Sequence, residues 1–162
     1  DKAFKIGDYV TIGGNSGTVQ DTGLLTTKLI TDDGKKVYIP NQVIFNSPFF
    51  NITASPQRRI ILDFEIPVGE DIVKAKSVIL DEIKSLQHVD KTDAVDVVFT
   101  NVKQGVFTMR IKFWLEIGGN FTNVKSDAIM QINDRLMKEH ISLVTPTSIS
   151  VVQQPSGEDD RA

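Results

Sequence analysis

Two pairs of adjacent carboxylates are the first residues of this sequence that could do chemistry. Asp32-Asp33 and Glu70-Asp71 each bring two acidic side chains together, as general acid–base catalysis or a cation site would require. Asp33 is followed by glycine, which is the composition of a tight turn. Glu70-Asp71 falls in the expected first turn of a helix, where the helix dipole favours negative charge. Local structure therefore accounts for both pairs.

The histidines offer no better reactive centre. His88 and His140 are the only two in the chain, cysteine is absent, and polar or charged residues flank each histidine. Isolated histidines of this kind are typical of a solvated surface rather than of a metal site or a catalytic base. We therefore predict that the chain is not an enzyme, with no catalytic residue, no metal ligand and no cofactor-binding residue.

The glycine-rich segment 13–17 could be read as a phosphate-binding loop. It lacks the lysine of a P-loop, and no helix is expected after it. We interpret it as a hairpin connection. Two Asn-x-Thr patterns, at Asn51 and Asn120, match the glycosylation acceptor pattern, which occurs often by chance.

Three residues are candidates for an interface between domains or subunits. Arg58-Arg59 could hold an anion or a lipid headgroup, and the alternatives are a salt bridge between domains or a solvated strand start. Trp114 is expected on the polar side of its strand, which indicates a second buried surface there, against either the all-β unit or another subunit. The alternative is a partly exposed Trp114 that packs on the alkyl stems of its neighbours.

Composition and charge limit the possible partners. The 162 residues are 40% hydrophobic, enough for one sizeable core or two small ones, and the net charge is −3. Lysine and arginine are scattered among the acidic residues, so we expect no nucleic-acid partner. No apolar run reaches the roughly 20 residues that cross a bilayer. Because the chain starts at Asp1 without a leader, we expect it to be an excised fragment or a processed product of a longer protein. The lack of cysteine fits the cytoplasm.

Residues 5–53 predict a small all-β unit, because short apolar runs alternate with turn residues at close spacing. We expect strands over residues 9–12, 17–20, 24–31 and 37–40. Leu25, Thr27 and Leu29 would share one side of their strand. Asp33-Gly34 would then supply the positive φ angles of a tight hairpin.

The second half of the chain alternates long strands with amphipathic helices. We expect strands over residues 58–67, 95–99 and 107–115, and a last strand containing Ile149 and Val151 after Pro146. Two helices would bury the faces Ile72, Ala75, Ile79, Ile83, Leu86 and Phe121, Val124, Ala128, Ile132, Leu136. The order β-α-β-β-α-β predicts a ferredoxin-like fold with both helices on one face of an antiparallel sheet.

The predicted fold class is therefore α+β, in two domains joined near Ser55-Pro56. We expect a small all-β barrel of the Sm or SH3 type over residues 1–54 and a ferredoxin-like domain over residues 55–154. Residues 155–162 are polar and acidic, and we expect a disordered tail there.

The opening Ala3-Phe4-Lys5-Ile6-Gly7-Asp8-Tyr9-Val10 resembles the start of the β domain in the family of small-conductance mechanosensitive (MscS) channels, which typically reads Pro-Phe-x-Ile-Gly-Asp-x-Val. Further matches follow in the same order and at similar spacing. The residues that carry them are Gly17-Thr18-Val19, Thr27, Asp33-Gly34, Ile39-Pro40-Asn41 and Asn51-Ile52-Thr53. In the second half the resemblance continues through Arg58-Arg59, Trp114, Ile141 and Pro146. The chain departs from the family at Ala3, Thr22 and Val144.

The resemblance implies a structural role for the motif residues Phe4, Gly7, Asp8, Val10, Gly17, Val19, Thr27, Gly34, Pro40, Asn41 and Asn51. It also implies membrane helices upstream of Asp1, an inner-membrane location with this part in the cytoplasm, and a homo-oligomeric ring, a heptamer in the best-known member. Such a ring would enclose a vestibule that ions and small osmolytes leave through side portals during osmotic down-shock. The alternative function is a soluble oligomeric binding module for a regulatory nucleotide or another small ligand.

Overall fold

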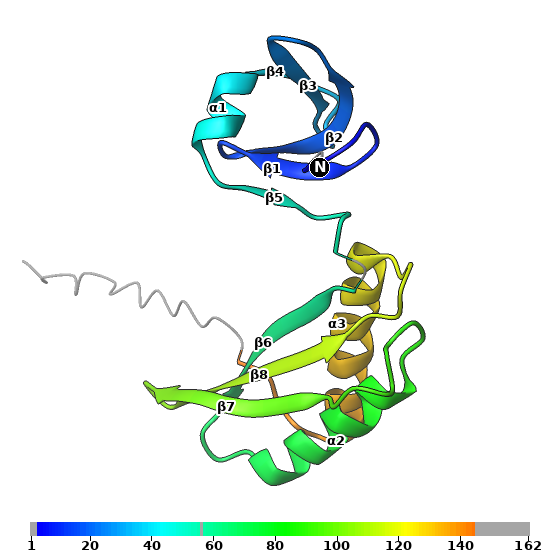
Figure 1. Cartoon of the computed structure of the whole chain (residues 1–162). Helices are drawn as coiled ribbons and strands as arrows, with labels where there is room; N and C mark the ends of the chain where they lie inside the picture. Colours follow the sequence, from blue (N-terminus) through cyan, green and yellow to red (C-terminus); the bar gives the residue numbers. More distant parts are fainter. Residues whose placement is uncertain (1–2, 56, 145–162) are drawn as a thin grey trace, which may run out of the picture.

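The computed structural model describes residues 3–55 and 57–144, which form two units joined by a short connection (Figure 1). The first unit contains β1 (Tyr9–Ile12), β2 (Asn15–Thr22), β3 (Thr26–Ile30), β4 (Lys36–Pro40), α1 (Asn41–Asn46) and β5 (Phe49–Asn51). Its antiparallel sheet has the strand order β4-β3-β2-β1-β5 and curls into a small barrel. The core comprises Val10, Ile12, Val19, Leu29 and Ile39. The predicted all-β barrel is confirmed, with one added helix.

Tight turns connect the first strands. Gly13 and Gly14 both adopt positive φ and connect β1 to β2, so the predicted hairpin is present. The connection is shorter than the predicted segment 13–17, because residues 15–17 belong to β2. In the turn between β3 and β4, Gly34 has a φ of 82°, but Asp33 is not among the non-glycine residues with positive φ. The prediction that both residues adopt positive φ is therefore wrong. Backbone bonds from Gly34 N to the Thr31 oxygen and from Thr31 N to the Lys35 oxygen close the turn.

Two other local predictions for this unit are wrong. The expected strand 24–31 is shorter, because Leu24 and Leu25 belong to the turn before β3 and are 94% and 78% exposed. Thr27 and Leu29 do share the buried side, but Leu25 does not. Helix α1 also lies within residues 5–53, where an all-β unit was expected. It has six residues and no capping side chain, so the sequence carries little signal that predicts it.

The second unit contains β6 (Arg59–Pro67), α2 (Ile72–Ser85), β7 (Asp96–Lys103), β8 (Val106–Trp114) and α3 (Phe121–Lys138). Its antiparallel sheet has the order β6-β8-β7, and both helices cover one face (Figure 1). These five elements follow the predicted order. The predicted last strand with Ile149 and Val151 and the predicted tail 155–162 lie outside the described residues.

The helices are positioned by side-chain caps and by a shared core. Asp71 precedes α2 and accepts a hydrogen bond from Lys74 N, so it is the cap rather than part of the first turn as predicted. Asn120 caps α3 in the same way through Asn123 N. The helices bury Ala75, Val78, Ile79, Ile83, Val124, Ala128, Ile132 and Leu136 against Ile60, Leu62, Ile66, Met109, Ile111 and Phe113 of the sheet. The expected helix faces are therefore the buried ones.

None of the helices in residues 3–55 and 57–144 is long and apolar enough to cross a membrane.

Candidate functional site

A hydrogen-bonded lock centred on Asp8 fixes the entry of the chain into the first unit. Asp8 Oδ2 accepts from Lys5 N at 3.0 Å and from Asn51 Nδ2 at 2.9 Å. Asn51 Nδ2 also donates to the Ala3 oxygen at 3.1 Å. The Lys5 backbone amide, followed by the Asn51 amide, lowers the pKa of the largely buried Asp8 below its ordinary value. The lock therefore ties the first residues to β5.

Two more motif residues complete this region. Gly7 adopts a φ of 93°, and its backbone amide donates to the Val19 oxygen at 2.8 Å. The ring of Phe4 meets Phe49 edge to face, with 5.5 Å between the ring centroids. The chain thus enters the barrel along β5 with its first aromatic residue packed against the core.

A second lock joins β3 to α1. The hydroxyl of the buried Thr27 donates to Asn41 Oδ1 at 2.8 Å. Asn41 Nδ2 then donates to the backbone oxygens of Gly23 and Leu24, both at 2.9 Å. Pro40 ends β4 and immediately precedes Asn41, so it delivers this asparagine to the turn. The lock holds the turn that carries Leu24 and Leu25.

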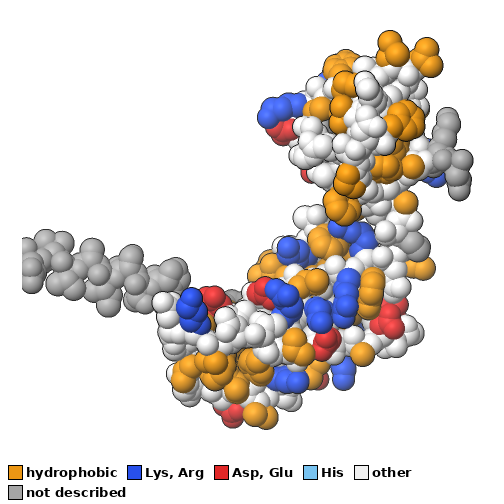
Figure 2. Space-filling view, turned by 60° about the vertical axis from the view of Figure 1, so that its left-hand side comes forward, with side chains coloured by type: hydrophobic (Ala, Val, Ile, Leu, Met, Phe, Trp, Pro, Cys, Tyr) orange, Lys and Arg blue, Asp and Glu red, His pale blue; other side chains and the backbone are white. Residues whose placement is uncertain are grey.

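These contacts support an apolar pocket at one end of the barrel. The pocket has a volume of about 770 Å³ and is lined mainly by Phe4, Ile44, Phe45, Pro48 and Phe49, with Thr27 and Asn41 as polar lining. Phe45 is 86% exposed at its rim, and the exposed Leu24 and Leu25 follow the pocket-lining Gly23. Figure 2 shows hydrophobic side chains gathered over this unit. We call the pocket with Leu24, Leu25 and Phe45 the apolar end.

The sequence did not single out the apolar end. Residues Val43 to Phe50 alternate neither with a helical period nor with a strand period, so no face could be assigned to them. The signal that could have found it is the density of large apolar residues between Asn41 and Asn51. Such residues seldom stay exposed on a monomer unless they serve an interaction.

At the junction of the units, Arg58 and Arg59 contact aromatic rings. The Arg58 guanidinium lies 3.9 Å from the centroid of Phe121, and that of Arg59 lies 5.4 Å from the centroid of Trp114. The Arg58 oxygen accepts from Leu115 N at 2.9 Å. Within residues 3–55 and 57–144, neither arginine forms an ion pair. The predicted interface residues therefore come together on the second unit.

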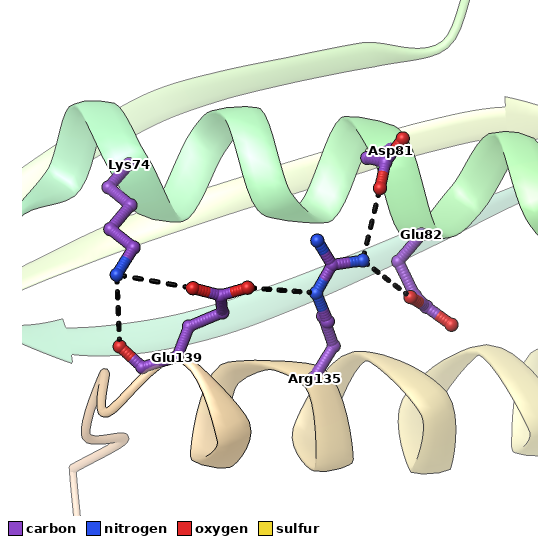
Figure 3. Close-up of polar contacts among 5 residues, drawn as sticks. All are labelled: Lys74, Asp81, Glu82, Arg135 and Glu139. Carbon is purple, nitrogen blue, oxygen red and sulfur yellow. Dashed lines mark hydrogen bonds and ion pairs between the residues drawn. The ribbon is translucent and has the colours of Figure 1, made fainter.

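A network of ion pairs joins the two helices on their outer side (Figure 3). Arg135 of α3 contacts Asp81 and Glu82 of α2 at 3.0 and 3.4 Å, and Glu139 at 3.2 Å. Lys74 of α2 contacts Glu139 at 3.2 Å. The Lys74 ammonium, and then Arg135, lower the pKa of Glu139 below its ordinary value. This arrangement is suited to holding the helices together rather than to catalysis.

The histidines lie at element ends. His88 and His140 adopt φ of 61° and 57°, and His88 Nδ1 lies 3.7 Å from Glu116 Oε2. In the described part of the chain, histidine and acidic side chains form no group of three or more that could hold a metal ion.

Comparison with known proteins assigns both units. A family model of the mechanosensitive ion channel beta-domain matches residues 1–54, and one of the C-terminal region of the mechanosensitive ion channel MscS matches residues 60–143. The structure superposes on Helicobacter pylori MscS in its closed state with a TM-score of 0.84 and 27% identity, covering 94% of this chain and 61% of that one. Arabidopsis thaliana MSL1, at 21% identity and a TM-score of 0.76 over 89% of this chain and 54% of that one, shares the fold.

Sequence relatives agree with this assignment. A small-conductance mechanosensitive channel of Helicobacter pylori is 29% identical over 86% of this chain and 51% of the relative. An uncharacterized MscS family protein of Archaeoglobus fulgidus is 30% identical over 92% of this chain and 52% of the relative. The chain thus spans about half the length of these relatives.

Proposed function

This chain belongs to the MscS family of mechanosensitive ion channels, and we propose that it is the cytoplasmic vestibule of a tension-gated channel in the inner membrane. In this role the β domain forms a collar below the pore, and the α/β domain forms the wall of the vestibule. Ions and small osmolytes pass through portals in that wall during osmotic down-shock. Charged side chains at the portal rims filter them by electrostatics.

The observation that carries this proposal, beyond family membership, is the apolar end of the β domain. Leu24, Leu25 and Phe45 expose large apolar surfaces beside a pocket that is already lined by aromatic rings. Such surface is costly in water and is normally covered by another chain or segment. In the proposed ring, each β domain lies beside its neighbours and below the membrane helices. These neighbours would cover the apolar end.

The motif residues act in this proposal as supports for the collar. The Asp8–Asn51 and Thr27–Asn41 locks fix both the incoming chain and the exposed turn at Leu24-Leu25. A rigid collar can transmit movement between the vestibule and upstream pore helices, whereas a loose one would absorb it. We assign these residues a structural role and assign none of them a catalytic role.

Light scattering coupled to size exclusion tests the assembly directly. For the purified chain of 18.0 kDa, we expect a discrete ring of about seven copies that persists on dilution. A stable dimer that binds nucleotide in equilibrium dialysis would instead support a soluble binding module and overturn the vestibule. A monomer at all concentrations would show that the chain does not supply the ring contacts, contrary to the proposal.

A further inference from the structure

Asp33-Gly34 is the one place in the sequence where an aspartate precedes a glycine. The dipeptide lies in the turn between β3 and β4, and both residues are exposed to water. Glycine has no Cβ atom to crowd its amide nitrogen. Around Gly34, apart from its chain neighbours, no heavy atom lies within 4 Å of the place where a Cβ would stand. The crowding that slows reactions of the peptide nitrogen at other residues is therefore absent here.

An aspartate followed by glycine is open to a spontaneous rearrangement. The Gly34 nitrogen attacks Cγ of the Asp33 carboxyl group and loses its proton, and a carboxyl oxygen leaves as water, which forms a cyclic succinimide. Water then adds to either carbonyl of this ring. Addition at the side-chain carbonyl restores aspartate, whereas addition at the main-chain carbonyl leaves the chain linked through the side chain, as isoaspartate. One water is released and one is consumed, and the backbone of the turn gains a methylene.

The folded turn holds both reacting groups. The Thr31 hydroxyl donates to Asp33 Oδ1, and Lys35 Nζ lies 2.6 Å from Asp33 Oδ2. The Thr31 hydroxyl also accepts from Lys35 N at 2.9 Å, which fixes the two residues relative to each other. On the side of the nucleophile, the Gly34 amide donates to the Thr31 oxygen at 2.9 Å. We call these contacts of Thr31 and Lys35 the turn clamp.

The turn clamp opposes both requirements of the rearrangement. The carboxyl group must be protonated, because a neutral acid loses water far more readily than a carboxylate does. The Lys35 ammonium, followed by the Thr31 hydroxyl, instead lowers the pKa of Asp33 below its ordinary value. The amide of Gly34 must give up its proton, but that proton is engaged in the bond to the Thr31 oxygen.

We propose that Asp33-Gly34 is a site of isoaspartate formation that Thr31 and Lys35 hold in the unmodified form as long as the turn is folded. This inference goes beyond the proposed channel role and does not depend on assembly. The reaction would damage the hairpin, because Ile30 pairs with Lys36 directly beside the turn. A longer backbone link between these two residues breaks the register of β3 and β4.

Peptide mapping of the aged chain tests the proposal. The purified chain and a synthetic peptide of residues 26–38 are kept at neutral pH and then digested with trypsin, which releases residues 29–35 from both. Isoaspartate is separated by chromatography and identified by electron-transfer fragmentation. We expect it to form at least about fivefold more slowly in the folded chain, the rate equivalent of about one hydrogen bond. Equal rates in the chain and the peptide would overturn the proposal.

Two variants and a matched control assign the protection to the turn clamp. Thr31→Val keeps the branched shape of the side chain and removes the hydroxyl, and Lys35→Gln removes the ammonium. Each should raise the rate about two- to fivefold. Lys36→Gln removes a positive charge next to Lys35 and leaves the clamp in place, so it should react at the parent rate. If neither Thr31→Val nor Lys35→Gln reacts faster than Lys36→Gln, the clamp has no protective role.

The pH profile separates the loss of the clamp from a loosened turn. Of the charged groups here, Lys35 contacts Asp33, whereas the Asp32 carboxylate accepts from the Tyr9 hydroxyl at 3.1 Å. When a clamp residue is removed, the pKa of Asp33 moves back up, so the reactive neutral acid persists to higher pH. The rate profiles of Thr31→Val and Lys35→Gln should therefore shift to higher pH. A faster reaction with an unshifted profile would assign the effect to backbone movement and contradict the proposal.

Discussion

Gly17 and Ile30 lie so close across β2 and β3 that a Cβ atom at position 17 would stand 2.4 Å from the Ile30 carbonyl oxygen. Glycine is therefore required at this position by the close approach of a neighbouring strand, not by a positive φ. Substitution of Gly17 by alanine must push β3 away or distort the sheet.

We predict that Gly17→Ala destabilises the β domain by about 1–3 kcal/mol, the usual cost of overpacking. The matched control is Gly34→Asn, because Gly34 has open space around its Cβ direction and asparagine tolerates positive φ. The control should cost about 1 kcal/mol or less. Urea unfolding followed by far-UV circular dichroism measures both variants.

The single tryptophan makes this test specific for one unit, because Trp114 lies in β8 of the α/β domain. Its fluorescence transition should stay at the same urea concentration in Gly17→Ala while the circular dichroism transition gains a component at lower urea. A variant as stable as the parent chain by both probes would contradict the close approach.

The Thr27–Asn41 lock predicts a cost for Asn41→Ala. This change removes three side-chain hydrogen bonds, to Thr27 and to the Gly23 and Leu24 oxygens, and leaves the buried Thr27 hydroxyl without its acceptor. We expect a loss of about 1–3 kcal/mol in unfolding free energy and faster hydrogen exchange at Gly23, whose amide donates to the Thr26 oxygen. The neighbouring exposed change Gln42→Ala serves as the control and should have little effect. Equal stability of the two variants would show that the lock contributes nothing.

Arg135 is the hub of the network between α2 and α3, and Arg135→Gln removes its pairs with Asp81, Glu82 and Glu139. Since Arg135 and its partners remain partly exposed to water, we expect a cost of only about 0.5–1 kcal/mol that shrinks at high salt. Urea unfolding followed by Trp114 fluorescence measures it. Lys138→Gln removes one positive charge from the same helix without breaking these pairs, so it should be near neutral. A cost that is independent of salt would argue against an electrostatic role.

Acidification should destabilise the fold. Hydrogen bonds from Lys5 and Asn51 lower the pKa of Asp8, those from Arg110 lower that of Asp63, and Lys112 lowers that of Asp96. Each group therefore contributes stability above its unfolded pKa of about 4, which is lost as the pH falls through the lower folded pKa. The urea midpoint should drop as the pH falls below about 4, and Asp63→Asn should reduce that drop. A urea midpoint that rises as the pH falls would contradict the predicted direction of this effect.

Sequence patterns predicted the helices and strands in which buried residues recur at a regular spacing. The alternation of Ile60, Leu62 and Ile66 in β6 and the stripe Val124 to Leu136 in α3 both correspond to buried faces. The short helix α1 and the turn at Leu24-Leu25 could not be predicted in this way. Their conformation depends on Asn41, whose bonds reach residues distant in sequence.

The candidate sites were predictable to a lesser degree. Arg58, Arg59 and Trp114 were singled out, but their contacts were not, because Phe121 stands far along the chain from Arg58. Contacts between residues that are far apart in the chain cannot be predicted from a single sequence. The apolar end could not be predicted for the same reason, since Phe4 and Phe49 meet only after the barrel closes.

The central claim, that this chain serves a tension-gated channel, is tested most directly by electrical recording. The complete gene product that contains this chain is expressed in cells that lack their own mechanosensitive channels, and membrane patches are stretched by suction. We predict currents that appear with tension and are absent from patches without the protein. A gene product that reaches the membrane but gives no tension-activated current would contradict the account.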